Sequence, residues 1–199
     1  MLGDANFPTA LPTRILHHGA KFDFVQASLP ARDGTPITRE FIRHPGAVVI
    51  LPLLEDHAGP RVVLIRNWRL SLARAILELP AGTLGRGEDP RHAAARELRE
   101  ETGFAAATLD PIGWFHTSPG LSDEVMWAFL ARGLTGGDAR PEPDEHIVVE
   151  PTPLGSVPAL IRRGVLSDAK SMLTMFLAAN APAMPAAAKA AWTRGMLEA

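Results

Sequence analysis

The sequence has 199 residues, of which 46% are hydrophobic and 21% charged, so it can form one globular domain with a buried core, or one domain with a small extension. Its formal net charge is −2, which excludes the basic field that holds a nucleic-acid backbone, and we expect no nucleic-acid partner. It contains no cysteine, which excludes disulfide scaffolds, thiolate zinc sites and cysteine nucleophiles.

The first quarter of the chain shows strand patterns. Two strand-like runs, Phe22–Ser28 and Ile37–Ile42, flank the turn signal Ala31–Gly34 and predict an N-terminal hairpin. The apolar runs that follow, Ala47–Leu54 and Arg61–Ile65, predict central strands. The N-terminus lacks the pattern of a signal peptide, and no stretch approaches the roughly 20 apolar residues of a spanning helix. We therefore expect a cytoplasmic protein with no membrane partner.

A helix is predicted from Pro90 to Thr102. Asp89 suits its N-cap, proline is tolerated in the first turn, and Gly103 suits the position after the last turn. Further strands are expected at Ile112–His116, Val125–Ala131 and Ile147–Val149, helices near Ser156–Arg163 and Asp168–Ala179, and one more helix-like stretch at Pro185–Arg194. Strands interleaved with helices, without regular alternation, favour an α+β fold with a mixed sheet.

The helix predicted at Pro90–Thr102 carries a cluster of carboxylates. At 100° per residue, Glu97 and Glu101 lie one turn apart on one face with Glu100 beside them. Like charges at this spacing cost a few tenths of a kcal/mol, and acidic side chains at a helix C-terminus oppose the helix dipole. A hard divalent cation such as Mg²⁺ would offset both effects and bridge the carboxylates to substrate phosphates. If the helix is considered alone, the alternative to a metal site is a charged face that is simply exposed to solvent.

The spacing around this helix resembles the complete Nudix box. Gly82, five residues, Glu88, seven residues and Arg-Glu-Leu-x-Glu-Glu-x-Gly-Phe ending at Phe104 fill every defined position. The resemblance implies a Nudix-type α/β/α sandwich with an N-terminal antiparallel hairpin extension. It also implies that Glu88 and Arg96 pair and brace the loop, with Gly82 and Gly103 as structural positions of the box.

The same resemblance implies a metal centre. In this family the glutamates that match Glu97 and Glu101 bind the metals, often joined by the one that matches Glu100. The backbone carbonyl of Ala81, directly before the first glycine of the box, is the further ligand that the family pattern implies. Mg²⁺ is the expected cofactor and Mn²⁺ an alternative. These four residues are therefore our candidate metal ligands, and the three glutamates are also candidate catalytic residues.

Two further patterns resemble the ADP-ribose pyrophosphatase subgroup. The segment Leu77–Gly82, which includes Glu78, looks like the subgroup's Leu-Glu-Leu-Pro-Ala-Gly, and Ser118-Pro119-Gly120 places a proline 16 residues after Gly103. The late Gly-x-x-x-Asp-Ala pattern at Gly164–Ala169 also matches. The resemblance divides the chain into an N-terminal β region (1–43), which in relatives builds a homodimer and the adenine site, a hydrolase domain (44–180) and an Ala- and Pro-rich tail (181–199).

Substrate contacts are predicted around the box. Arg66 and Arg69 lie on the preceding segment, and an arginine fork matches phosphate oxygens. Trp68 is a candidate for stacking on a base, although relatives carry Arg-Gln-Phe/Tyr-Arg where this chain has Asn67 and Trp68. We also assign substrate contacts to Glu78, in the segment Leu77–Gly82, and to Ser118, Pro119 and Gly120 downstream of the box.

The general base is expected outside the box. In relatives a glutamate of a later loop takes the proton of the attacking water. Glu145, directly before a predicted strand, is our first candidate for that role, and Glu142 is the alternate. A solvated loop carboxylate is the competing interpretation.

Together these patterns predict Mg²⁺-dependent hydrolysis of a nucleoside diphosphate derivative, with ADP-ribose as the first choice and AMP and ribose 5-phosphate as products. A hydrolase of nucleotide sugars such as GDP-mannose would use the same metals and diphosphate contacts. A non-catalytic sensor of ADP-ribose or another nucleotide is the alternative from another class. No zinc-protease, nucleophile-elbow or P-loop motif occurs in the sequence.

Overall fold

The computed structural model describes residues 11–57, 59–136 and 146–198. Within these ranges the chain forms two compact units. One contains the residues up to Gly46 together with His116–Val125, and the other contains Ala47–Phe115 and the chain from Met126 onward. We describe each unit by itself.

The smaller unit is built on a three-stranded antiparallel sheet. Its strands are β1 (Thr13–His18), β2 (Asp23–Pro30) and β3 (Pro36–Arg43), in the order β1-β2-β3. The predicted hairpin corresponds to β2 and β3, so that prediction is confirmed. Strand β1 was not predicted, because all six of its residues are exposed and it lacks the alternation of apolar and polar residues that marks a half-buried strand.

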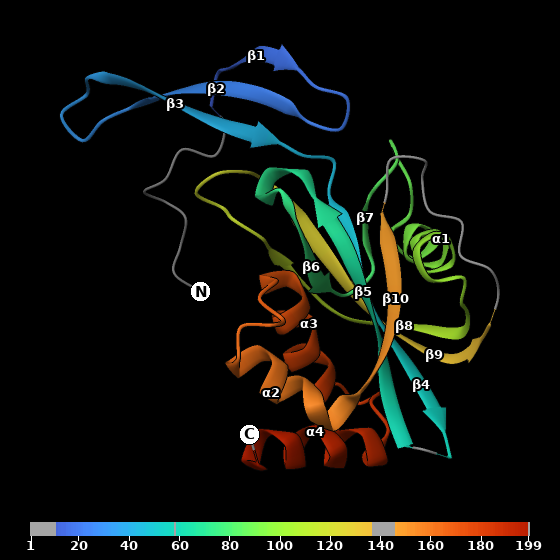
Figure 1. The fold of residues 1–199 in the computed structure, drawn as a ribbon. Helices are drawn as coiled ribbons and strands as arrows, with labels where there is room; N and C mark the ends of the chain where they lie inside the picture. The colour runs from blue at the N-terminus through green and yellow to red at the C-terminus, as the bar shows by residue number, and fades with distance from the viewer. Residues whose placement is uncertain (1–10, 58, 137–145, 199) are drawn as a thin grey trace. The chain divides into compact units, whose positions relative to one another are not determined.

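The larger unit contains a seven-stranded mixed sheet (Figure 1). The strand order is β10-β5-β4-β9-β8, with β6 paired to β5 and β7 paired to β4. Strands β4 and β9 run parallel, whereas β5 pairs antiparallel with β4, β6 and β10. The strands are β4 (Ala47–Asp56), β5 (Gly59–Arg69), β6 (Arg74–Glu78), β7 (Ala81–Thr83), β8 (Ala105–His116), β9 (Val125–Thr135) and β10 (Ile147–Pro153).

Helices cover both faces of this sheet. They are α1 (Pro90–Thr102), α2 (Val157–Arg162), α3 (Ala169–Asn180) and α4 (Ala186–Glu198), with short 3-10 turns at Leu70–Leu72 and Leu154–Ser156. Along β4, Val49 and Leu51 join the core under α2, α3 and α4, whereas Val48 and Ile50 join the core under α1. Burying each such side chain contributes about 1.5–3 kcal/mol. Because β4 is buried on both faces, its sequence is continuously apolar, and the predicted α/β/α sandwich is confirmed.

Helix α1 begins and ends where its capping residues predict. The carboxylate of Asp89 accepts hydrogen bonds from the backbone N–H groups of Arg91 and His92, at 2.9 and 3.3 Å. At the other end Gly103 has a φ of 74°, a left-handed conformation that glycine adopts without strain, and its N–H donates to the Arg99 carbonyl at 2.9 Å. The box helix is therefore fixed at both ends by local interactions.

Helix α4 packs the Ala- and Pro-rich end of the chain onto the core. Ala188 and Trp192 are buried among the residues under α2 and α3. Gly195 approaches the turn before α2 so closely that a Cβ atom there would lie 2.0 Å from the carbonyl oxygen of Gly155. A larger residue at position 195 would force the helix away from this turn.

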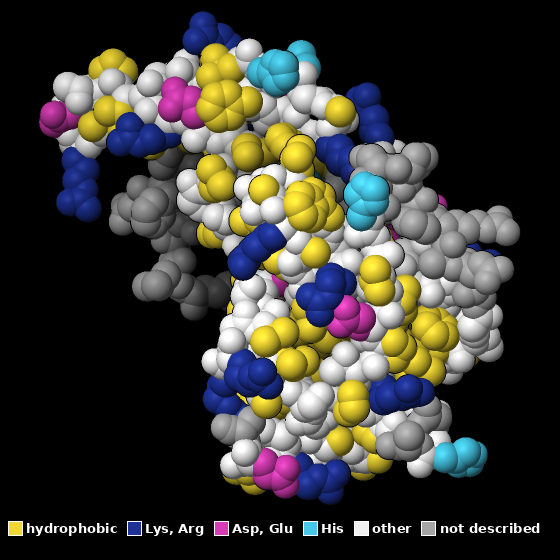
Figure 2. Space-filling view, in the orientation of Figure 1, with side chains coloured by type: hydrophobic (Ala, Val, Ile, Leu, Met, Phe, Trp, Pro, Cys, Tyr) yellow, Lys and Arg dark blue, Asp and Glu magenta, His cyan; other side chains and the backbone are white. Residues whose placement is uncertain are grey.

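The surface mixes charges of both signs. On the face shown in Figure 2, basic and acidic side chains are scattered among hydrophobic ones over the described residues. Within the described part of the chain, no helix combines the length and apolar character needed to cross a membrane.

Candidate active site

The C-terminal half of α1 places three carboxylates together. Glu97 is 8% exposed and Glu101 only 1%, although both are acidic. Glu100 is more open, with 36% of its side chain exposed. Because the neighbouring Leu98 is buried in the core, the helix keeps its apolar side against the sheet and its acidic residues along one edge of that contact.

One arginine links these carboxylates to the loop before the helix. Arg96 binds Glu88 through two hydrogen bonds of 3.0 Å, and its Nη1 contacts both Glu97 at 2.7 Å and Glu100 at 3.0 Å. Glu88 also accepts a 2.7 Å hydrogen bond from the N–H of Gly85. Hydrogen bonds from Arg96 lower the pKa of Glu88, and the surrounding carboxylates raise the pKa of Arg96. This ion cluster fixes the loop against the helix.

The first glycine of the box allows the loop to approach Glu97. A Cβ atom on Gly82 would lie 1.9 Å from the carboxyl carbon of Glu97, far inside van der Waals contact. Any other residue at position 82 would therefore displace either the strand or the carboxylate. The glycine is needed here for space, because its φ is not in the left-handed region.

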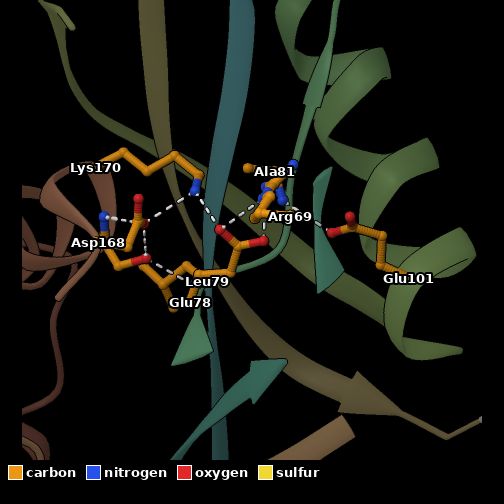
Figure 3. Close-up of polar contacts among 8 residues, drawn as sticks. Arg69, Glu78, Leu79, Ala81, Glu101, Asp168 and Lys170 are labelled. Atoms are coloured by element: carbon orange, nitrogen blue, oxygen red, sulfur yellow. Dashed lines mark hydrogen bonds and ion pairs between the residues drawn. The ribbon is translucent and has the colours of Figure 1, made fainter. Parts of the chain in front are cut away.

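The lead-in segment, Leu77–Gly82, is tied down through its backbone (Figure 3). The N–H of Leu79 donates to the hydroxyl of Ser171 at 2.7 Å, and the N–H of Ala81 donates to Glu101 at 2.9 Å. The carbonyl of Pro80 accepts from the N–H of Ile50 at 2.9 Å. Three successive residues are thus anchored to α3, β4 and α1.

The two candidate phosphate-binding arginines leave opposite faces of β5. Arg66 and Arg69 are three positions apart in an unbroken register with β6, and side chains alternate along a strand. Arg66 forms two hydrogen bonds with Glu150 of β10, at 2.6 and 3.1 Å. Arg69 binds Glu78 of β6, at 2.6 and 3.3 Å. Trp68, between them, is 46% exposed.

Glu78 is the most deeply buried acid of the described residues near the box, with 0% exposure. It accepts hydrogen bonds from Arg69 and from Lys170 of α3, the latter at 2.7 Å. A buried carboxylate costs several kcal/mol unless it is paired. Here two cations balance it, so Glu78 joins the strand pair β5–β6 to the start of α3.

The remaining predicted site residues are not among the described residues of the larger unit. Ser118, Pro119 and Gly120 belong to the smaller unit, where the Ser118 carbonyl accepts from the N–H groups of Leu121 and Ser122 at 2.8 and 2.9 Å. This segment is joined to β3 by hydrogen bonds and by the bridge between Ile42 and Ser122. Glu142 and Glu145, the candidates for the general base, lie outside the described residues.

The donor chemistry of the α1 cluster fits hard divalent cations. Carboxylate oxygens, with a backbone carbonyl, are the ligands that Mg²⁺ and Mn²⁺ prefer. In the described part of the chain no three acidic or histidine side chains are arranged to hold a metal ion. The contacts above give the reason, since Arg96 binds Glu97 and Glu100, and the Ala81 N–H binds Glu101. A cation bound here would compete with these donors for the carboxylate oxygens.

Sequence reasoning missed the part that α3 plays. Lys170 contacts Glu78 and Ser171 contacts the backbone of Leu79, each 92 positions away in sequence, and Asp168 binds Lys170. The one sequence signal was the Gly164–Ala169 pattern, which ends next to these residues. It corresponds to the turn between α2 and α3, where Gly164 has a φ of 67°.

Comparisons with known proteins show which proteins this chain resembles. The chain is 38% identical over 132 residues to an ADP-ribose pyrophosphatase of Bacillus subtilis, covering 66% of this chain and 70% of the relative. It is 33% identical over 145 residues to a methanol dehydrogenase activator of Bacillus methanolicus, covering 72% of this chain and 77% of the relative. A solved structure described as an ADP compounds hydrolase has a TM-score of 0.72 at 22% identity, covering 84% of this chain and 90% of that chain, and shares the fold.

A family model matches about two thirds of the chain, including the box. The NUDIX domain model matches residues 43–173, which span β4 to the first turn of α3 and include the whole acidic cluster. The matched region also contains the lead-in segment and both arginines of β5. This chain belongs to the NUDIX family of hydrolases.

Proposed function

We propose that this protein hydrolyses the pyrophosphate bond of ADP-ribose to AMP and ribose 5-phosphate. The observation that carries the proposal is the acidic cluster of α1, packed against a glycine that leaves room only for the Glu97 carboxylate. Glu97 and Glu101 are largely buried, so their charges must be offset by groups of opposite charge. The similarity to an ADP-ribose pyrophosphatase supports the choice of substrate.

Mg²⁺, with Mn²⁺ as the alternative, is the cofactor of this proposal. The carboxylates of Glu97, Glu100 and Glu101 and the carbonyl of Ala81 would hold it. The N–H of Ala81 points to Glu101, and the N–H and C=O of one strand residue share an edge of the strand. The carbonyl therefore faces the same side as that carboxylate. Bound cations supply charge neutralisation at the diphosphate and a more acidic water.

The chain's own residues bind the substrate and move the proton. Arg69 is our first candidate to contact a diphosphate oxygen, because 38% of its side chain is exposed while Glu78, which is wholly buried, holds its guanidinium. Arg66 is the second, on the other face of β5. Hydrolysis adds the oxygen of water to one phosphorus, breaks the bond to the bridging oxygen and leaves the electron pair on the departing phosphate. Glu145, or Glu142 as the alternate, would take the proton of that water.

Three further features belong to the same proposal. Trp68 and the turn at Ser118-Pro119-Gly120 complete the proposed substrate contacts, whereas Glu78, which was predicted as a contact, has no exposed surface and acts through Arg69. The N-terminal β region is proposed to form a homodimer and contribute to the adenine site. The protein is proposed to act in the cytoplasm on a freely diffusing nucleotide derivative.

A product analysis tests the proposed function. The purified chain is incubated with ADP-ribose, GDP-mannose, other nucleotide sugars and dinucleoside polyphosphates, with Mg²⁺ and Mn²⁺ compared, and the products are separated by anion-exchange chromatography. We expect ADP-ribose to be cleaved most efficiently, giving equal amounts of AMP and ribose 5-phosphate. Preferred cleavage of GDP-mannose would instead support a nucleotide-sugar hydrolase. If no compound is cleaved, the result would favour a non-catalytic sensor of ADP-ribose or another nucleotide.

A further inference from the structure

The first turn of α3 forms a partly buried set of charges with the strands before the box (Figure 3). Lys170 donates to Glu78 at 2.7 Å and to Asp168 at 2.9 Å, and only 14% of its side chain is exposed. Glu78 in turn binds Arg69. Arg69, Glu78, Lys170 and Asp168, two cations and two anions, therefore form a linear chain of contacts with no net charge.

Asp168 fixes the position of Lys170. Its carboxylate caps α3 by accepting a 3.0 Å hydrogen bond from the N–H of Ser171 and also accepts from the hydroxyl of that serine. An N-cap aspartate is held by the helix end and stabilised by the helix dipole. Because Asp168 is held by the helix end, it fixes the ammonium group of Lys170. Lys170 in turn fixes the carboxylate of Glu78.

This arrangement decides where the Arg69 guanidinium lies. Arg69 and Glu78 share one face of the β5–β6 pair, because Ile65 pairs with Glu78 and side chains two positions apart repeat on one face. The carboxylate contacts Nε and Nη2 of the guanidinium. A long arginine side chain loses most of its rotamer freedom only when such a two-point contact is itself fixed.

The same turn of α3 also holds the backbone of the lead-in segment. The Ser171 hydroxyl accepts the Leu79 N–H, two residues before Ala81, whose N–H contacts Glu101. One helix start thus positions an arginine on one side and the segment leading into the box on the other. This gives the Asp168-Ala169 part of the sequence pattern a physical role.

Stability alone explains this cluster poorly. Replacing a buried ion network by apolar residues of similar volume is often neutral or stabilising, so a core that needed only packing would not require four charges here. Arg69 is also 38% exposed, which allows a ligand to reach it. The cost of burying Glu78 is better explained by holding the guanidinium in one orientation.

We infer that Lys170 is a positioning residue, which acts through Glu78 to hold the Arg69 guanidinium against the diphosphate of the substrate. The inference rests on the proposed function, in which Arg69 contacts that diphosphate. Lys170 itself does not touch the substrate. Its contribution is to substrate binding, so it affects KM more than kcat.

Kinetics of Lys170→Met test the inference, with Lys189→Met on α4 as a matched control. We expect Lys170→Met to raise KM for ADP-ribose about tenfold, in the range for loss of a supporting contact, and to change kcat less than about threefold. Lys170→Arg, which keeps the charge, should restore most of the affinity. Lys189→Met should match the wild type.

A double-mutant cycle separates positioning from a structural role. If Lys170 acts through Arg69, Lys170→Met added to Arg69→Ala raises KM no further, because the group it positions is gone. An additional tenfold increase in the double variant would overturn the inference, as would a wild-type KM in Lys170→Met. Should Lys170→Met fail to fold, Asp168→Asn keeps a capping side chain and removes the anchoring charge, and we expect a KM about threefold higher.

Binding measurements keep this inference distinct from the proposed function. Calorimetric titration of ADP-ribose with EDTA present gives a Kd without turnover for the wild type and the variants. A wild type that binds ADP-ribose in this titration but does not cleave it when Mg²⁺ or Mn²⁺ is supplied would refute the proposed hydrolysis, and the expected tenfold weaker Kd of Lys170→Met would still support the inference. A chain that neither binds nor cleaves ADP-ribose overturns both.

Discussion

The glutamates bound by Arg96 and the buried Glu78 of the lead-in segment are neutralised in different ways. On α1, Arg96 contacts Glu88, Glu97 and Glu100, which lie between one and eight positions away in sequence. At the start of α3, Glu78 is wholly buried and is balanced by cations 9 and 92 positions away. The first cluster forms within one loop and helix, whereas the second exists only once the sheet and α3 have packed together.

This difference separates the α1 carboxylates, which are proposed to bind the cation, from Glu78, which is proposed to position Arg69. On α1, Glu97 and Glu100 share with Glu88 one guanidinium that is 36% exposed, and Glu101 accepts from the neutral N–H of Ala81, so these carboxylates can take up a cation at lower cost than a wholly buried ion pair could. Glu78 is buried, and exchanging its partners would cost several kcal/mol. We therefore expect changes in the α1 cluster to lower turnover with little loss of stability, and changes at Glu78 to lower stability and substrate affinity.

Glu101→Gln should have the largest effect on turnover. The amide keeps the shape and the hydrogen bond to the Ala81 N–H but removes the charge that a cation requires. We expect kcat to fall about 10²–10³-fold, with an unchanged circular dichroism spectrum and melting temperature. Glu55→Gln, at an exposed position of β4, is the matched control. An unchanged rate would refute the assignment of Glu101 as a metal ligand.

Gly82→Ala tests the close approach of the loop to Glu97. The added Cβ would lie 1.9 Å from the carboxyl carbon, so the carboxylate must move by an ångström or more. A misplacement of that size costs roughly 100-fold in kcat/KM. Gly136→Ala is the control, because its Cβ would meet only Phe104, at an ordinary 3.8 Å. Activity within twofold of the wild type would show that Glu97 can move without loss.

The sequence predicted the parts of this molecule that depend on local contacts. The bounds of α1 follow from Asp89 and Gly103, and the continuous apolar run of β4 follows from burial on both of its faces. Strand β1 has no buried face, so it left no pattern to detect. The contact of Glu78 with Lys170 depends on how the chain returns to the sheet, which no spacing in the sequence specifies.

Glu78→Gln should have the largest effect on stability. The substitution removes the buried charge that Arg69 and Lys170 share, and charge-assisted hydrogen bonds contribute about 1.5–3 kcal/mol each. We expect the free energy of unfolding, measured with urea at pH 7, to fall by about 2–3 kcal/mol. The matched Glu55→Gln should stay within about 0.5 kcal/mol of the wild type. A loss no greater than that of Glu88→Gln would contradict the contrast between the two clusters.

Glu88→Gln should have the smallest effect, and that effect should depend on pH. Hydrogen bonds from Arg96 and from the Gly85 N–H lower the pKa of Glu88 below its ordinary value of 4.5. The ionised form therefore stabilises the fold above about pH 4.5, and this contribution is lost as the pH falls through the lower pKa of the folded state. At pH 7 we expect the free energy of unfolding of the wild type to exceed that of Glu88→Gln by about 0.5–1 kcal/mol, as for partly exposed ion pairs. Urea unfolding at pH 7, 5 and 3 measures the difference, and a difference that grows toward low pH would show that the pair with Arg96 does not brace this loop.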